Sequence, residues 1–185
     1  MSVVDTLNIQ AIVNFLRSRV LSLASGSVDI GIICGSGLAD LDKGVTQAVS
    51  IPYASIPHFP SSTVAGHGNE LVFGLLGGHS VVVARGRFHM YEGHAPATTG
   101  LLPRVFAALG ARVLVVTNAA GGVNPGFAVG DIMLIRDHIS LPAMSGLHPL
   151  VGANDARFGP RFPAVTNAYD DRCAQAVEDA ARDLG

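Results

Sequence analysis

The feature that most limits the possible folds is a set of short, aliphatic runs that alternate with amphipathic stretches. Val28–Cys34 and Val113–Val116 are two of these runs. Near-continuous runs of Val, Ile and Leu are typical of strands that are buried on both faces. Such strands alternating with helices predict an α/β fold with a mostly buried sheet.

Hydrophobic spacing also predicts where the helices and the other strands lie. An apolar stripe at helical spacing begins near Asp5 or Thr6 and ends by Gly26, and it is formed by Ile9, Ile12, Val13, Leu16, Val20 and Leu23. Two apolar runs joined by Gly77 and Gly78 predict a β-hairpin. Residues 40–69 are expected to be loop or edge structure. Further elements are predicted as helices at 98–109 and 167–184 and a strand at 131–139, with Pro103 delaying or kinking the first of these helices.

Composition limits the classes of partner. The chain has 185 residues, of which 49% are hydrophobic and 14% charged, with a net charge of -2. This predicts one folded domain over residues 1–185 and gives no basic surface for nucleic acid. Two distant cysteines, Cys34 and Cys173, predict reduced thiols rather than a disulfide framework. We see no secretory signal and no apolar stretch long enough to span a membrane, so the expected location is cytoplasmic.

The first strand ends in Gly35-Ser36-Gly37, a turn with several conceivable roles. A dinucleotide fingerprint needs a small third residue where the chain has Asp40, whose carboxylate would repel a pyrophosphate. A nucleophile elbow needs glycines at the positions of Cys34 and Leu38. Two hypotheses remain, an anion-binding turn that uses backbone N–H groups and a hydroxyl, and a tight turn without a ligand.

A denser group of polar and aromatic residues follows the hairpin at residues 85–93. In an extended chain Arg85, Arg87 and His89 point the same way, so we expect two guanidinium groups and an imidazole on one face. This set suits an oxyanion, although a solvated strand end is the alternative. Tyr91 combines an apolar ring with a polar tip and suits contact with a sugar.

Two further segments hold candidate residues. His67 lies between two glycines, and a lone histidine of this kind is structural more often than functional. The other histidines show no ligand spacing, so we predict no metal site. The run Asn118-Ala119-Ala120-Gly121-Gly122 closes a strand with small residues, which let a ligand approach the backbone or simply form a tight exit.

Together these motifs resemble the trimeric purine nucleoside phosphorylases, of the type that acts on inosine and guanosine. The resemblance covers roughly residues 28–170 and keeps the family's order. It is carried by the segments 31–38, 59–67, 86–93, 116–122, 130–139 and 154–163, among which Gly86-Arg87-Phe88-His89-Met90-Tyr91-Glu92-Gly93 is the most distinctive.

The resemblance implies a fold and a reaction. The fold is a three-layer α/β/α arrangement with a mixed, partly barrel-like central sheet flanked by helices. The reaction is the reversible phosphorolysis of purine ribonucleosides and deoxyribonucleosides, which gives the free base and pentose 1-phosphate. Inorganic phosphate is the co-substrate, no metal or organic cofactor is implied, and the expected assembly is a homotrimer.

The resemblance also implies roles for individual residues. Phosphate is bound by Ser36, Arg87, Phe88, His89 and the backbone at Ala119, with His67 closing over it. Tyr91, Asn118 and Ala119 contact the nucleoside, and Phe162 reaches the sugar pocket of a neighbouring subunit. His89 and Asn118 are the candidate catalytic residues.

The chain departs from the family pattern after its last predicted helix. The family continues with a C-terminal third that holds the purine, and the residues of that part have no counterpart here. The activity of the 185-residue chain is therefore an open question. The alternatives are a catalytically incomplete phosphate- or nucleoside-binding fragment, a structural subunit that binds no phosphate, and a relative of the methylthioadenosine phosphorylases.

Overall fold

The computed structural model describes residues 6–20, 27–35, 38–60 and 68–185, so the predicted site residues Ser36 and His67 lie outside the described residues. The helices of the described part are α1 (Thr6–Val20), α2 (Pro96–Thr99), α3 (Leu101–Leu109), α4 (Leu141–Met144) and α5 (Asp171–Leu184). Its strands are β1 (Ile30–Cys34), β2 (Thr46–Pro52), β3 (Glu70–Leu76), β4 (His79–Arg85) and β5 (Val113–Val116).

These strands form one open, mixed sheet in the order β2-β3-β4-β1-β5. β1 is the centre of its parallel part, because it pairs in parallel with both β4 and β5. β2, β3 and β4 are antiparallel neighbours. The mixed sheet is therefore as predicted, but the five described strands form an open sheet and not a partly barrel-like one, with β2 and β5 as its edge strands.

A tight turn between β3 and β4 forms the predicted hairpin. Leu76 pairs with His79, and the two residues between them are Gly77 and Gly78. Both glycines have positive φ angles, 58° and 83°. A two-residue hairpin turn of this kind needs positive φ at both positions, which glycine adopts without strain.

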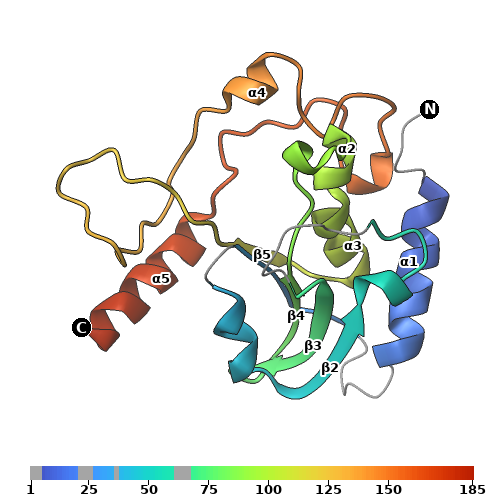
Figure 1. Ribbon diagram of the computed structural model, residues 1–185, viewed down its shortest axis with the longest axis horizontal. Helices are drawn as coiled ribbons and strands as arrows, with labels where there is room; N and C mark the ends of the chain where they lie inside the picture. Colours follow the sequence, from blue (N-terminus) through green and yellow to red (C-terminus); the bar gives the residue numbers. More distant parts are fainter. Residues whose placement is uncertain (1–5, 21–26, 36–37, 61–67) are drawn as a thin grey trace.

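One face of the sheet is covered by α1 and α3, which pack against each other (Figure 1). The stripe predicted for α1 is buried at Ile9, Ile12, Val13, Leu16 and Val20, whereas Leu23 lies outside the described residues. Gly31 of β1 faces α3, and a Cβ there would lie 2.4 Å from Cδ2 of Phe106. The missing side chain lets α3 approach the sheet closely and bury Phe106.

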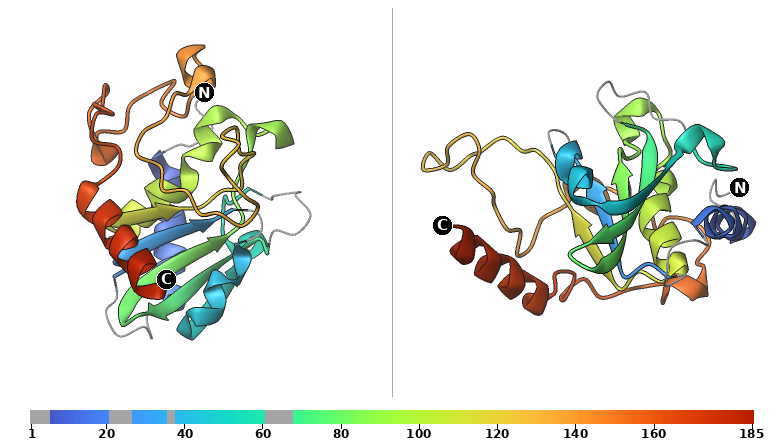
Figure 2. Two further views of the ribbon diagram at one scale, coloured as in Figure 1. Left: turned by 90° about the vertical axis from the view of Figure 1, so that its left-hand side faces the viewer. Right: turned by 90° about the horizontal axis from the view of Figure 1, so that it is seen from below.

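The other face of the sheet has a smaller core. Side chains of β1, β3 and β4 meet there beside Val45, and the buried members of this core are Ile32, Cys34, Val45, Val72, Val81 and Val83. Figures 1 and 2 place α5 on the opposite side of the sheet from α1. No residue of α5 is buried.

The helix predicted at 98–109 is divided in two. Pro96–Thr99 forms α2, and α3 starts only at Leu101, after Gly100. Pro103 therefore lies in the first turn of α3, where its missing N–H breaks no helical hydrogen bond. The sequence had left open a late start or a kink, and the structure has the late start.

Residues 117–170 form mostly irregular chain, and the strand predicted at 131–139 is absent from the described structure. Ile132 and Ile139 are 92% and 84% exposed. A strand is stabilised by cross-strand pairs, and none of the five described strands pairs with this segment. The prediction of a strand at 131–139 is therefore wrong for the described structure, because an apolar pattern does not by itself supply a pairing partner.

Candidate functional site

Three polar segments leave the sheet at the same edge. β1, β4 and β5 are parallel, and the register pairs Cys34 with Arg85 and Ile33 with Val116. The residues that follow these strands, Gly35, Gly86 and Thr117, therefore start from neighbouring positions. Ligands of open α/β sheets bind beyond the carboxyl ends of such strands. The three segments therefore begin at the same end of the sheet.

The segments after β1 and β5 are joined directly. The N–H of Gly35 donates to Oγ1 of Thr117 over 2.9 Å, and the N–H of Thr117 donates to the carbonyl of Ile33 over 3.0 Å. A Cβ on Gly35 would lie 2.4 Å from the carbonyl oxygen of Thr117 and 2.7 Å from Cα of Asn118. Glycine is therefore required here by close approach, because backbone atoms occupy the space of a side chain.

Arg87 reaches across to the same segment. Its Nη1 donates to the carbonyl oxygen of Thr117 over 3.0 Å. The preceding residue, Gly86, has a φ of 130°. Its carbonyl accepts a 2.7 Å hydrogen bond from the buried phenol of Tyr53. Burial raises the pKa of Tyr53, so the phenol keeps the proton that it donates.

His89 and Tyr91 form an aromatic pair at the outer end of the segment. Their rings are stacked, with centroids 4.6 Å apart and planes at 20°. Tyr91 is 75% exposed. The N–H of His89 donates to Oε1 of Glu92 over 3.0 Å, which fixes the start of the short 3₁₀ turn Met90–Glu92.

Phe88, between Arg87 and His89, is far less exposed than Tyr91. Its side chain is buried and lies near the rings of Tyr53, Phe59 and His94. We therefore expect only the backbone of Phe88 to contribute to a phosphate site. The packing of Phe88 in this aromatic cluster holds the segment 85–93 against the core, while Arg87 and His89 on either side of it stay half-buried.

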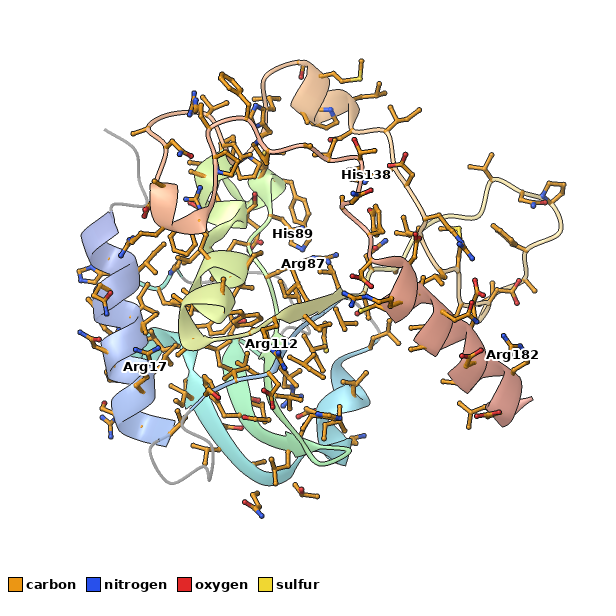
Figure 3. All side chains as sticks on the ribbon, turned by 180° about the vertical axis from the view of Figure 1, so that it is seen from behind. Arg17, Arg87, His89, Arg112, His138 and Arg182 are labelled. Atoms are coloured by element: carbon orange, nitrogen blue, oxygen red, sulfur yellow. The ribbon has the colours of Figure 1, made fainter. Side chains whose placement is uncertain are left out.

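Arg87 and His89 line an open cavity of about 360 Å³. They are two basic side chains among mostly apolar neighbours, and the other lining residues are Ile33, Phe88, Met90, Thr99, Leu102, Pro103 and Val116. Figure 3 shows Arg87 and His89 close together beside the strands, with His138 on the long irregular segment. A cavity with this lining can hold an anion next to an apolar group.

Arg85 does not join these two residues, which corrects the predicted row of three basic groups. Its Nη1 lies 2.5 Å from Oε1 of Glu70 and 3.4 Å from Oδ2 of Asp42. The strand alternation ends at Gly86, whose positive φ turns the chain before Arg87. Arg85 therefore forms ion pairs with two carboxylates, and of the two arginines only Arg87 lines the cavity beside His89.

The remaining predicted residues lie farther apart. Asn118 and Ala119 come after Thr117, the first residue beyond β5, and are exposed, and Nδ2 of Asn118 donates to the carbonyl of Ala119 over 3.2 Å. Phe162 is 87% exposed on the irregular segment, where its ring lies 5.8 Å from the guanidinium carbon of Arg161. The structure thus brings Arg87, His89 and the start of the Asn118 segment together, and it leaves Phe162 without a buried contact.

Sequence reasoning assigned no role to Tyr53 or Thr117. Tyr53 lies in the proline-rich segment 40–69, which is expected to be loop or edge structure, and no motif there distinguishes it. Thr117 was part of a recognised motif, yet only its neighbours Asn118 and Ala119 were singled out. Both act through residues far away in the sequence, and local spacing carries no signal for such contacts.

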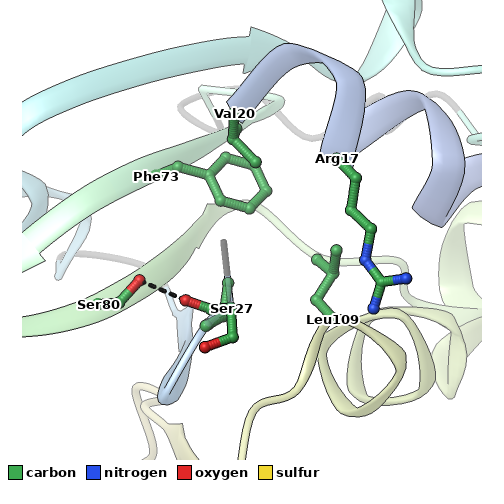
Figure 4. Close-up of a pocket in the computed structure, with 7 residues that line it drawn as sticks. Arg17, Val20, Ser27, Phe73, Ser80 and Leu109 are labelled. Atoms are coloured by element: carbon green, nitrogen blue, oxygen red, sulfur yellow. Dashed lines mark hydrogen bonds between the residues drawn. The ribbon is translucent and has the colours of Figure 1, made fainter. Parts of the chain in front are cut away.

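A second, much smaller cavity does not form a competing site. A cavity of about 10 Å³ lies beside α1 and β3, near Arg17, Phe73 and Ser80, and the hydroxyl of Ser80 donates to the carbonyl of Ser27 over 2.8 Å (Figure 4). It has room for at most one water molecule.

The described residues contain no group of three or more His, Cys, Asp or Glu side chains placed to hold a metal ion. They also contain no helix with the length and apolarity needed to cross a membrane.

Known proteins resemble this chain in sequence. A family model described as the phosphorylase superfamily matches residues 29–185. The chain is 51% identical to the purine nucleoside phosphorylase of Bos taurus over 166 residues, which are 90% of this chain and 57% of that protein. It is 50% identical to purine nucleoside phosphorylase 1 of Geobacillus stearothermophilus over 159 residues, 86% of this chain and 57% of that protein. The chain therefore spans little more than half the length of these relatives.

Solved structures resemble it in fold. Purine nucleoside phosphorylase of Schistosoma mansoni in complex with adenosine superimposes with a TM-score of 0.89 at 42% identity, over 98% of this chain and 62% of that one. A purine nucleoside phosphorylase in complex with ribose-1-phosphate gives a TM-score of 0.88 at 44% identity, over 98% and 65%. The predicted nucleoside phosphorylase fold is thereby confirmed. Sequence and fold agree over most of the chain, which belongs to the phosphorylase superfamily.

Proposed function

We propose that this chain carries the phosphate half of a purine nucleoside phosphorylase. The reaction is the reversible phosphorolysis of nucleosides such as inosine and guanosine to the free purine and (deoxy)ribose 1-phosphate. The observation that carries the proposal is the meeting of Arg87 and His89 in one open cavity at the carboxyl end of the parallel strands. The relatives named above support purine nucleosides as the substrate class.

The reaction places specific demands on such a site. A phosphate oxygen attacks C1′ of the sugar and forms a C–O bond, while the bond from C1′ to the purine nitrogen breaks. The electron pair of that bond leaves with the purine, which then takes up a proton. The sugar carries positive charge in the transition state, so the site must hold a dianion next to a developing cation.

Arg87 and His89 are suited to holding the phosphate dianion. A guanidinium offers several N–H donors in a fixed geometry that matches phosphate oxygens. Backbone N–H groups at Phe88 and Ala119 would add donors, and the family resemblance adds Ser36 and His67. Holding the nucleophile against C1′ removes much of the entropic part of the barrier, and effective molarities of this kind are worth about 7–11 kcal/mol.

The nucleoside would lie outside the phosphate. Tyr91 offers an exposed ring beside His89 for the sugar, and Asn118 and Ala119 border the same end of the sheet. Phe162 is exposed enough to contact a neighbouring subunit, which supports the proposed role across a homotrimer interface. The trimer and a cytoplasmic location stay predictions from the sequence.

A second candidate function is a phosphate- or nucleoside-binding fragment without turnover. It is favoured by one observation, the coverage of only 57% of the length of the relatives. By the family resemblance, the residues that hold the purine belong to a part of the relatives that this chain does not match.

One experiment separates the two candidates. The purified chain is incubated with inosine, with and without inorganic phosphate, and hypoxanthine is measured, while phosphate binding is followed by calorimetry. Phosphate-dependent hypoxanthine release supports the phosphorylase and excludes the inert fragment. Phosphate binding without release supports the fragment. A chain that neither binds phosphate nor releases hypoxanthine refutes both the phosphorylase and the phosphate-binding fragment.

A further inference from the structure

Thr117 connects the two parts of the candidate phosphate site. It is the first residue after β5, and its backbone N–H continues the parallel pairing by donating to Ile33 over 3.0 Å. Its hydroxyl accepts from Gly35, and its carbonyl accepts from Arg87. One residue therefore holds the glycine turn with its side chain and the guanidinium with its backbone.

The bond to Gly35 matters because Gly35 is buried. A buried N–H without an acceptor is costly, so the Thr117 hydroxyl satisfies a group that would otherwise stay unpaired. The close packing of Gly35 against the Thr117 carbonyl leaves little room for another arrangement. The hydroxyl thus fixes where the glycine turn begins.

The bond to Arg87 sets the other side of the site. A guanidinium donates along directions fixed by its planar group, so one bond to the Thr117 carbonyl orients the remaining donors. The same peptide segment therefore determines the position of Arg87 relative to Gly35. If Thr117 moves, both groups move with it.

From this geometry we propose that Thr117 is a positioning residue for phosphate, which acts through Gly35 and Arg87 and does not touch the substrate. The inference rests on the proposed function, because it assumes that phosphate binds beside Arg87. It assigns a role to the hydroxyl in particular, since the carbonyl would be present with any residue at this position.

The test uses three variants of the chain. Thr117→Val removes the hydroxyl and keeps the shape of the side chain, and Thr117→Ser restores the hydroxyl. Thr46→Val is the matched control, because the hydroxyl of Thr46 also makes one hydrogen bond, to the carbonyl of Leu75, but on the distant edge strand β2. The measurements are the dissociation constant for inorganic phosphate by calorimetry, hydrogen exchange of the Gly35 amide by NMR, and the thermal midpoint.

We expect Thr117→Val to weaken phosphate binding about three- to tenfold, the range for one lost hydrogen bond, and to speed exchange of the Gly35 amide. Thr117→Ser should restore both values, and Thr46→Val should change neither. A purely structural role would lower the thermal midpoint of Thr117→Val without changing the phosphate affinity of the folded chain, and this result would overturn the inference.

Failure of the proposed function gives a different pattern. In that case the unmodified chain binds no phosphate, which refutes a positioning role for phosphate along with it. The exchange rate of the Gly35 amide then still reports whether the hydroxyl holds the turn. Phosphate binding by the unmodified chain with an equal affinity in Thr117→Val refutes the role of Thr117 alone.

Discussion

The phenol of Tyr53 donates a buried 2.7 Å hydrogen bond to the carbonyl of Gly86, the residue immediately before Arg87. The donor is only 1% exposed and lies 33 residues away in the sequence. This bond fixes the backbone at the point where the chain turns from β4 toward the cavity. The geometry of Arg87 therefore depends on a residue that belongs to the core.

Replacing Tyr53 by Phe should lower stability while leaving the aromatic packing in place. The Gly86 carbonyl loses its partner, and an unsatisfied buried group costs about 1–3 kcal/mol. The thermal midpoint, measured by circular dichroism, should fall by about 2–10 °C for a chain of this size. Tyr91→Phe is the control, because Tyr91 is 75% exposed and its change should leave the midpoint unaltered. Equal midpoints for Tyr53→Phe and the unmodified chain would show that the bond is unimportant.

A methyl group at Gly35 should damage both the fold and the site. Its Cβ would lie 2.4 Å from the carbonyl oxygen of Thr117, so the two strand ends must separate. We expect Gly35→Ala to cost about 1–3 kcal/mol, as overpacking does, and to weaken phosphate binding. Gly121→Ala is the matched control, because nothing lies within 4 Å of a Cβ at that position. Urea unfolding gives the stability, and a Gly35→Ala variant as stable as the control would contradict the close approach.

Removing the guanidinium of Arg87 should reduce phosphate binding directly. A hydrogen bond to a charged group contributes about 1.5–3 kcal/mol, so Arg87→Ala should raise the phosphate dissociation constant by roughly tenfold or more. Arg112→Ala removes the same charge at the opposite end of β5, next to its first residue Val113, and should have little effect. Calorimetric titration with inorganic phosphate gives both constants. Equal affinities for the two variants would contradict a direct contact between Arg87 and phosphate.

Alkaline pH should destabilise the protein through two buried acids. Burial raises the pKa of the Cys34 thiol above its ordinary value of 9.0, with the Asp42 charge as a further cause, and burial also raises the pKa of Tyr53. The unfolded chain therefore loses these protons at a lower pH than the folded chain. Linkage then makes the free energy of unfolding fall as pH rises above about 9.

The measurement is urea unfolding at neutral and at alkaline pH. A variant with both Cys34→Ala and Tyr53→Phe should lose less stability on going to alkaline pH than the unmodified chain. Cys173→Ala, at an exposed cysteine, is the control and should keep the original dependence. If the double variant and the unmodified chain lose stability equally, the two buried acids are not its source.

Much of the local structure follows from the sequence. The stripe at 9–20 became α1, since helical spacing gathers its apolar residues on one side. The two glycines at 77 and 78 specified the hairpin through their positive φ. The glycine-rich and polar segments directly after aliphatic runs supplied the candidate site residues. These features are encoded locally because each depends on residues only a few positions apart.

Tertiary structure decided the rest. Arg85 and Arg87 share a sequence pattern, but Arg85 forms an ion pair with Glu70 on the neighbouring strand. The positive φ of Gly86 turns the chain before Arg87, so the two side chains do not lie in one row. The apolar segment at 131–139 stays irregular because a strand needs a partner as well as a pattern. Gly35 and Thr117 meet across 82 positions because β1 and β5 are parallel neighbours. The sequence by itself therefore determined the elements and the residue types of the site, whereas strand order determined which of those residues meet, because that order depends on packing across the whole sheet.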